Sequence, residues 1–141
     1  MKYWLLKSEP STWSWNNQVQ SNKTNWDGVR NYQARNNLIK MKKGDLSFFY
    51  HSVKEKTIVG IVKIIKESYP DPTDKKNKFV MVDVETYKNL KRPVHLEEIK
   101  KDSRLKHLGL IKQSRLSVMP IDYKSWSIII KLSNTSLQIK N

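Results

Sequence analysis

Two apolar runs, LSFFYH (Leu46–His51) and TIVGIVKII (Thr57–Ile65), lie on either side of the short polar stretch SVKEK. Both runs are rich in aromatic and β-branched residues, which favours a pair of β-strands joined by a short connection. Gly60 stands inside the second run. A glycine in the interior of a strand indicates a bulge or a close approach of other atoms to the backbone.

Shorter strands and several helices are predicted on both sides of this pair. Asn31 can cap a helix that runs to Lys40, because Ala34, Leu38 and Met41 recur at helical spacing. Strands outnumber the space available for βαβ crossovers, so we expect a mixed α/β (α+β) fold with a mostly antiparallel or mixed sheet, curled into a small barrel with flanking helices. The other expected elements are strands at Tyr3–Lys7, Phe79–Thr86 and Leu116–Met119, helices at Ser11–Gln20, Pro93–Lys101 and Asp122–Lys131, and a turn at Tyr69–Pro72.

The length and the absence of cysteine limit the architecture. A chain of 141 residues fits one domain with one core, which we expect over residues 1–133, with a frayed tail over residues 134–141. Without cysteine there can be no disulfide, thiolate zinc site or cysteine nucleophile. Only four uninterrupted apolar residues precede Lys7, and no run is long enough to span a membrane. We therefore expect no signal peptide, no membrane partner and a cytoplasmic location.

The charge of the chain points to an anionic partner. Lys and Arg number 27 against 13 Asp and Glu, giving a formal net charge of +14. A basic surface attracts phosphate backbones. The same charge could reflect biased composition alone, since 22 of the basic residues are lysine and only 5 are arginine. The excess is spread along the chain and forms no polybasic tail, which favours a basic folded surface.

No arrangement of residues typical of catalysis stands out. The three histidines lie at no metal-ligand spacing from one another, and no zinc-protease, nucleophile-elbow or phosphate-loop motif occurs. Asp45, His51 and Ser52 are triad residue types, but nothing in the sequence shows that they converge. The sequence therefore predicts a non-enzymatic protein with no cofactor and no metal.

Aromatic residues give a more specific indication. The chain holds five Trp and six Tyr, which can pack in a core or stack on nucleobases. In the segment Trp26–Asn31 (WDGVRN), a tryptophan precedes a turn-forming Asp-Gly, an arginine and an asparagine at a helix start. A helix start favours anions, and arginine can pair with phosphate. The residues alone leave a structural and a binding role for this segment equally open.

The sequence resembles the EVE domain family of the PUA-like superfamily over nearly its whole length. The resemblance implies a PUA-like, curved, mostly antiparallel β-barrel with flanking helices, an architecture shared with the YTH readers of methylated adenine. It rests on an ordered series of segments that ends with Trp126: YWLLKSEP (Tyr3–Pro10), WDGVRNYQARN (Trp26–Asn36), MKKGDLSFFYHS (Met41–Ser52), VGI (Val59–Ile61), YPDPT (Tyr69–Thr73), RPV (Arg92–Val94) and SRLSVMP (Ser114–Pro120).

The resemblance also implies a function, the reading of a modified nucleobase held flipped or unpaired in an aromatic-lined pocket. The expected partner is nucleic acid: modified cytosine in DNA, as in eukaryotic relatives, or modified RNA, with tRNA among the candidates. We expect a monomer. A general PUA-type RNA- or DNA-binding adaptor without selectivity for a modification is the main alternative. An RNA- or DNA-modifying or cleaving enzyme, and a protein-binding domain, are further alternatives.

Carried over position by position, the resemblance assigns a set of pocket residues. Trp26 and Tyr50 would be aromatic walls, Leu116 an apolar lining, and Arg30 and Arg115 contacts to phosphate or a base edge. Structural roles remain open for many of them, such as a turn or cap for Ser8, core packing for Trp26, a salt bridge for Arg30 and strand packing for Tyr50. The complete expected set is Lys7, Ser8, Trp26, Arg30, Asn31, Tyr50, His51, Ser52, Ser114, Arg115, Leu116 and Ser117.

Overall fold

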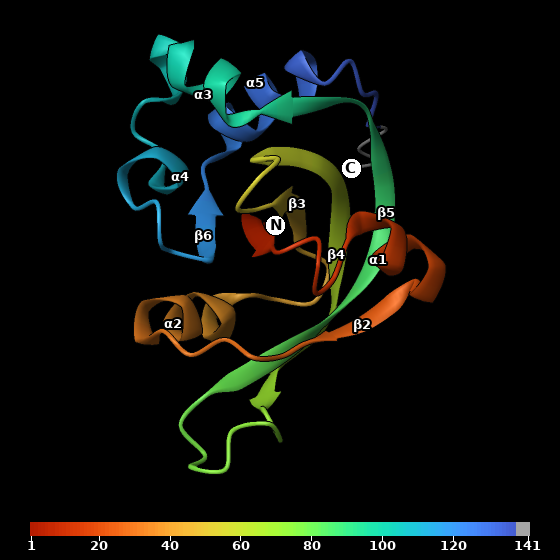
Figure 1. Ribbon diagram of the computed structural model, residues 1–141, viewed down its shortest axis with the longest axis vertical. Helices are drawn as coiled ribbons and strands as arrows, with labels where there is room; N and C mark the ends of the chain where they lie inside the picture. Colours follow the sequence, from red (N-terminus) through yellow and green to blue (C-terminus); the bar gives the residue numbers. More distant parts are fainter. Residues whose placement is uncertain (138–141) are drawn as a thin grey trace.

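The fold is a mixed α+β arrangement around one curved six-stranded sheet. The computed structural model describes residues 1–137. The strands follow the order β2-β5-β4-β3-β1-β6, and all neighbours are antiparallel except β1 and β3, which are parallel (Figure 1). The strands are β1 (Tyr3–Ser8), β2 (Lys23–Trp26), β3 (Leu46–His51), β4 (Thr57–Pro70), β5 (Val80–His95) and β6 (Val118–Ile121).

Short helices surround the sheet. Figure 1 shows α1 on one side of the sheet, α2 near the lower end of β4 and β5, and α3 and α5 at the opposite end. The helices are α1 (Trp15–Ser21), α2 (Tyr32–Lys40), α3 (Leu96–Lys101), α4 (Gly109–Lys112) and α5 (Tyr123–Leu132), with a short 3-10 helix at Ser103–Leu105.

The predicted central strand pair is confirmed, with Phe49 opposite Gly60 in the β3–β4 register. Both expectations for Gly60 hold. The pairing of β4 with β5 shifts register between Ile58 and Gly60. The indole of Trp15 also lies so close that a Cβ built on Gly60 would fall 2.2 Å from Cζ2. Gly60 therefore lets α1 seat its first residue directly on the sheet.

Several predicted boundaries differ from the structure. Helix α2 begins as expected, with the Asn31 side chain accepting a hydrogen bond from Ala34 N at 2.9 Å. Helix α1 is capped by Ser14, because its hydroxyl can accept from Asn17 N, and not by Ser11. The β4–β5 hairpin is longer than predicted, since β4 continues through Tyr69 to Pro70 before the turn begins. Strand β2 was not predicted.

The sheet is curved but open, which corrects the expected barrel. Its edge strands are β2 and β6, and the pairing within residues 1–137 does not join them. Helix α2 packs against β6, β5 and β4. Its Asn37 Nδ2 donates to the outward-facing carbonyl of Val118 on β6 at 2.7 Å. The edge of β6 is thus covered by a helix, and the four-residue β2 pairs, within the described part of the chain, with β5 alone.

Aromatic stacking dominates the core on the α5 side of the sheet. The rings of Phe48 and Trp126 stack at 3.9 Å with an interplanar angle of 20°, and the ring of Tyr3 lies 4.5 Å from Trp126. Trp4 is buried nearby and donates its indole N–H to Asp45 Oδ2 at 2.9 Å. This hydrogen bond ties β1 to the turn that precedes β3 and satisfies a buried polar group.

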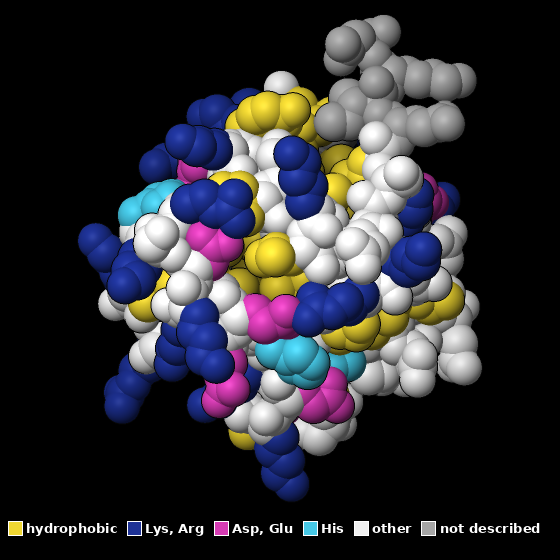
Figure 2. Space-filling model, turned by 90° about the horizontal axis from the view of Figure 1, so that it is seen from above, with side chains coloured by type: hydrophobic (Ala, Val, Ile, Leu, Met, Phe, Trp, Pro, Cys, Tyr) yellow, Lys and Arg dark blue, Asp and Glu magenta, His cyan; other side chains and the backbone are white. Residues whose placement is uncertain are grey.

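The expected tail lies partly outside the described residues. Residues 138–141 are not described, whereas Thr135 accepts a hydrogen bond from Lys91 N at 3.0 Å. No helix among residues 1–137 is both long and apolar enough to cross a membrane. Basic side chains are spread over the face that carries α3 and α5, with acidic side chains between them (Figure 2). This distribution agrees with a charge excess that is spread along the chain.

Candidate nucleic-acid interface

A pocket of about 860 Å³ lies between the chain that follows β1 and the chain that follows β2. Trp13 stands in one wall and Trp26 in the other, and Ser117 lies beside Lys7 on a third side. The volume falls within the range of roughly 300–1,000 Å³ that is typical of small-molecule sites. The remaining lining residues are Ser8, Glu9, Thr12, Ser21, Lys23, Thr24, Asn25, Asp27, Gly28, Val29, Arg30 and Asn31.

Trp13 is held in a fixed orientation by buried polar groups. Its indole N–H donates to Oε1 of the fully buried Gln18 at 3.0 Å. Gln18 in turn donates through Nε2 to Asn22 O at 2.8 Å, which anchors the amide at the end of α1. The Ser8 hydroxyl donates to the backbone carbonyl of Trp13. These bonds pre-organise the half-buried Trp13 ring before any ligand arrives.

Trp26 combines a core position with a place in the pocket wall. Its ring meets Phe49 edge-on, with centroids 5.5 Å apart and an interplanar angle of 86°. It is 8% exposed, so only a small part of the indole reaches the pocket. Strand β2 places it there through its pairing with Val82 on β5. The core and wall interpretations of Trp26 are therefore compatible.

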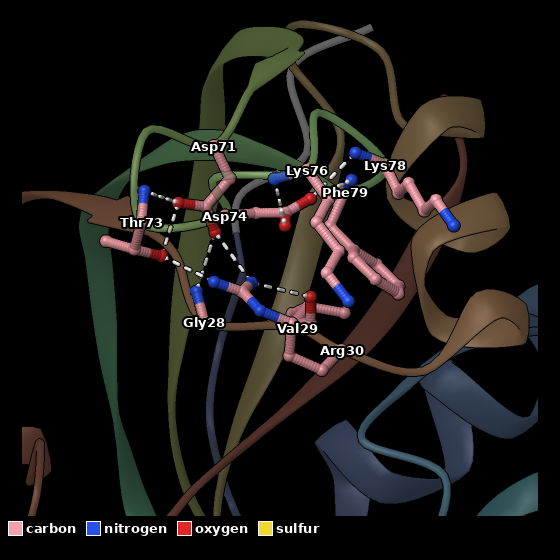
Figure 3. Close-up of polar contacts among 9 residues, drawn as sticks. All are labelled: Gly28, Val29, Arg30, Asp71, Thr73, Asp74, Lys76, Lys78 and Phe79. Carbon is pink, nitrogen blue, oxygen red and sulfur yellow. Dashed lines mark hydrogen bonds and ion pairs between the residues drawn. The ribbon is translucent and has the colours of Figure 1, made fainter.

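The rim that follows Trp26 is fixed by a buried carboxylate. Asp71 accepts from Gly28 N at 2.8 Å and from Arg30 Nη1 at 3.2 Å, both through Oδ2, while Oδ1 accepts from Thr73 N at 2.8 Å (Figure 3). Burial alone would raise the pKa of the Asp71 carboxyl, but the hydrogen bonds from Thr73, Gly28 and Arg30 outweigh it and lower the pKa. Gly28 has φ of +81°, a conformation that glycine adopts readily.

Lys7 closes the pocket on the side of Ser117. Its Nζ donates to Ser114 O at 2.8 Å and lies 5.7 Å from the centroid of the Tyr50 ring, while its backbone N–H donates to Ser117 O at 2.9 Å. Burial lowers the pKa of the Lys7 ammonium from its usual value. Lys7 thus links β1 to the segment before β6 and also brings a cation to the pocket.

Six residues of the expected set line this pocket, but several already have protein partners. The Ser8 hydroxyl is used by Trp13, and the Arg30 guanidinium also donates to Thr73 Oγ1 at 2.8 Å. The Asn31 side-chain oxygen caps α2. These contacts give Ser8, Arg30 and Asn31 positioning roles. The six lining residues are Lys7, Ser8, Trp26, Arg30, Asn31 and Ser117.

Tyr50, His51 and Ser52 lie behind the pocket and do not line it. Tyr50 is buried, and burial raises the pKa of its hydroxyl to about 12. His51 Nε2 accepts from Trp15 N at 2.9 Å, and His51 Nδ1 lies 2.7 Å from Glu55 Oε2. Because Nε2 accepts a backbone N–H, the proton of a neutral ring is on Nδ1 and is donated to Glu55. His51 therefore supports α1.

The segment Ser114–Leu116 is also outside the pocket lining. Ser114 contributes its carbonyl to Lys7, and Arg115 is exposed. Leu116 is buried and lines a second hollow of about 750 Å³, bounded by α2, α4, β6 and the start of α5. That hollow holds His107, whose Nε2 lies 2.8 Å from Asp122 Oδ1 and 3.1 Å from Ser125 Oγ. Because one ring nitrogen meets both partners, this group does not have the geometry of a catalytic triad.

Trp13 is the main pocket residue that the expected set lacks. It lies in the segment that follows β1, whose last residues are Lys7 and Ser8, and this position was a signal that could have placed it at the pocket. Asn25 is also absent from the set, and its Nδ2 donates to Tyr69 Oη at 3.0 Å and to Asp83 Oδ1 at 2.9 Å. Among residues 1–137, no group of three His, Asp or Glu side chains could hold a metal ion.

The fold and pocket together define a mixed α+β domain with a pre-formed site lined by two tryptophans. The EVE domain model matches residues 2–132. Thymocyte nuclear protein 1 of Mus musculus is 40% identical over 94% of this chain and 74% of its own length. The chain belongs to the EVE domain family, which confirms the resemblance seen in the sequence.

Solved structures share the fold. A protein from Rhodopseudomonas palustris is 47% identical, with a TM-score of 0.90 over 95% of this chain and 94% of its own. The human THYN1 protein, solved in complex with 5-methylcytosine-containing DNA, is 34% identical, with a TM-score of 0.88 over 97% of this chain and 100% of its own. A YTH domain of Zygosaccharomyces rouxii, in complex with N6-methyladenosine RNA, shares the fold at 15% identity and a TM-score of 0.60, over 97% of this chain and 88% of its own.

Proposed function

We propose that this protein is a non-enzymatic nucleic-acid-binding domain that holds a modified nucleobase, flipped or unpaired, between Trp13 and Trp26. The observation that carries the proposal is the pocket of about 860 Å³ with an indole in each of two walls and polar groups between them. We also propose that residues 1–133 act as one domain. The likeness to the YTH domain supports a PUA-like fold, here with an open sheet.

The pocket chemistry suits an extruded base better than a base within a duplex. Taking a base out of its stack costs a few kcal/mol, which aromatic side chains can return at roughly 1–3 kcal/mol per stacked base. Trp13 is already fixed by Gln18, so little ordering is left for the binding step. The lining residues Lys7 and Lys23 bring positive charge to the pocket.

The relatives support this ligand class. The human relative was solved with DNA that contains 5-methylcytosine, and at 34% identity it covers nearly the whole chain. A buried methyl group contributes only about 0.8 kcal/mol, so selectivity for one requires a close wall and polar contacts to the ring. The biological partner is either DNA or RNA, tRNA included. The affinities of the protein for DNA and RNA probes of the same sequence and modification distinguish these two polymers.

A direct test is mass spectrometry of nucleic acid that co-purifies with the protein. We expect one modified nucleoside to be enriched over its abundance in total cellular nucleic acid, and the enrichment to be lost in Trp13→Ala. Enrichment of nucleic acid without any modified nucleoside would favour the alternative, a general adaptor that reads the backbone. Such an adaptor would also keep its affinity in Trp13→Ala, because phosphate contacts do not need the indole.

A further inference from the structure

A row of two neighbouring rings with an arginine at each end extends from the pocket rim to the middle of α2. The Arg30 guanidinium lies 5.6 Å from the centroid of Phe79, and the ring of Phe79 lies 5.0 Å from that of Tyr32. The Arg35 guanidinium lies 4.8 Å from the centroid of the Tyr32 ring. We call these four residues, Arg30, Phe79, Tyr32 and Arg35, the Tyr32 platform. Tyr32 is 52% exposed, although its ring is among the larger apolar groups of the chain.

The platform is held in place by the loop between β4 and β5. This loop, residues 71–79, lies at the bottom of Figure 1 beneath α2. Asp71 fixes its first end to Gly28 and Arg30. Asp74 fixes its second end, because its carboxylate accepts from Lys76 N at 3.0 Å, Lys78 N at 2.7 Å and Phe79 N at 2.8 Å (Figure 3). The hydrogen bond from Lys76 N is the largest cause of the lowered pKa of Asp74.

The same loop brings positive charge to the edge of the platform. Lys75, Lys76 and Lys78 are exposed, and the Lys78 carbonyl accepts from Arg35 Nη1 at 3.2 Å. Platform and loop together hold five basic side chains against two acidic ones, Asp71 and Asp74. Asp71 is buried and paired with Arg30, so these two charges largely cancel, and the other four basic side chains face one acidic side chain, Asp74.

The platform is continuous with the pocket. Arg30 and Asn31 line the pocket, and Tyr32 is the next residue along the chain. Arg30 belongs to both the pocket lining and the platform, so a nucleotide adjacent to one held in the pocket would lie beside the platform. An exposed ring beside arginine planes is suited to an unpaired base, because the faces of a base inside a duplex are covered by its neighbours.

We propose that the Tyr32 platform binds the single-stranded segment next to the nucleotide in the pocket, with its first flanking base against Tyr32 and Arg35 and its phosphates at Lys75, Lys76 and Lys78. The inference rests on the proposed function and adds to it the form of the substrate. The protein would require an unpaired stretch beside the modified base, in either DNA or RNA. The platform then supplies affinity that is independent of base identity, whereas the pocket supplies selectivity.

The test compares one nucleoside with a longer strand. The probes are 5-methyl-2′-deoxycytidine and N6-methyladenosine, single-stranded DNA and RNA of about nine nucleotides carrying each modification, and the DNA annealed to its complement; single-strand-binding folds cover roughly 4–16 nucleotides. We expect the single strands to bind at least about fivefold more tightly than the nucleosides, as one added stacked base would give. Tyr32→Ala should remove this gain and leave nucleoside affinity unchanged.

Tyr123→Ala is a matched control. Tyr123, like Tyr32, is an exposed tyrosine at the first position of a helix that follows a side-chain cap, but it lies at the start of α5. The Tyr123→Ala variant should bind the single strands as tightly as the wild type does. Equal affinity of Tyr32→Ala and wild type for the single strands, or equal loss in Tyr123→Ala, would overturn the platform. So would binding of the annealed duplex as tightly as the single strand.

A second variant keeps the proposal testable if Tyr32→Ala folds poorly. Replacing Lys75, Lys76 and Lys78 with Gln should reduce the salt dependence of single-strand binding, by up to about 2 in the slope of log Kd against log salt, because each phosphate contact to a single strand contributes about 0.7. The matched control replaces Lys54, Lys56 and Lys100, which surround a small hollow near α3. An unchanged slope, or the same change in the control, would contradict the proposal.

The outcomes separate the platform from the pocket. Nucleoside binding without any gain for the longer strand would leave the pocket proposal standing and reject the platform. Single-strand binding that depends on Tyr32, without binding of any nucleoside, would support the platform and reject the pocket as the site of selection. Binding of no probe by the wild type would reject both.

Discussion

The indole of Trp15 lies against Gly60 at a distance that leaves no room for a side chain, since a Cβ on Gly60 would fall 2.2 Å from Trp15 Cζ2. The Trp15 indole N–H donates to Oδ1 of Asn89 at 2.6 Å, and Asn89 is the residue opposite Gly60 in the β4–β5 register. These contacts seat α1 across β4 and β5. Because Trp13 and its partner Gln18 belong to the same segment, the position of one pocket wall depends on this close approach.

Gly60→Ala should therefore destabilise the protein and disturb the pocket wall. An added methyl group with no space forces shifts that typically cost about 1–3 kcal/mol in the free energy of unfolding, measured here by urea denaturation. Gly109→Ala is the control, because a Cβ there would meet Met119 at ordinary distances of 3.6 and 3.7 Å. Equal stability of Gly60→Ala and Gly109→Ala would show that α1 does not depend on the close approach.

Asp71→Asn should loosen the rim of the pocket. An asparagine offers one acceptor oxygen where the carboxylate uses two, so one set of donors around Gly28 or Thr73 loses its partner. We expect a loss of about 1–3 kcal/mol in the free energy of unfolding at neutral pH. Asp27→Asn is the control, because Asp27 is exposed on the same rim, and it should change stability by less than about 0.5 kcal/mol.

The stability difference between the wild type and Asp71→Asn should also depend on pH. The pKa of Asp71 is lowered in the folded protein, so its ionised form stabilises the fold above the unfolded pKa of about 3.9. This contribution is lost as pH falls through the lower, folded pKa. The stability difference between wild type and Asp71→Asn should therefore shrink as pH falls below about 4. A difference that stays constant down to pH 2 would show that the charge of Asp71 is not what stabilises the rim.

The sequence predicted the parts of the fold that depend on local pattern. The strand pair around SVKEK and the Asn31 cap follow from side-chain type and spacing. Strand β2 could not be predicted from the sequence, because Lys23–Trp26 is short and mostly polar. Its extended conformation is stabilised by pairing with β5. The open sheet could not be predicted either, because whether the edge strands β2 and β6 pair is decided by tertiary packing. The contact of Asn37 on α2 with the distant Val118 on β6 is one example of such packing.

The family segments predicted several residues that the structure brings to one pocket, but not how those residues are held there. Family segments placed Trp26 and Arg30 at the pocket, and both line it. The sequence could not show that Arg30 is held by Asp71, because the two residues are 41 positions apart. Nor could it show that Gln18, fully buried at the helix interior, orients Trp13. Such pairs are fixed by tertiary packing and leave no local signal.

His51→Ala tests the structural role of the histidine behind the pocket. Removing the imidazole leaves the amide of Trp15 unpaired in a buried site, so we expect a loss of about 1–3 kcal/mol in the free energy of unfolding by urea denaturation. Glu55→Gln removes only the exposed partner and should change stability by about 1 kcal/mol or less. Cleavage or modification of labelled DNA or RNA by the wild type, abolished by His51→Ala, would instead identify an enzyme.

The central claim is that the pocket between Trp13 and Trp26 selects a modified base. Calorimetric titration of wild type, Trp13→Ala and Trp13→Phe with methylated nucleosides and their unmodified counterparts tests this claim most directly. We predict that at least one methylated nucleoside binds about fourfold more tightly than its counterpart, as one buried methyl group would give. Trp13→Ala should weaken that binding at least about fivefold, and Trp13→Phe should weaken it less. Equal affinity for every methylated and unmethylated pair, or an affinity that Trp13→Ala leaves unchanged, would contradict the claim.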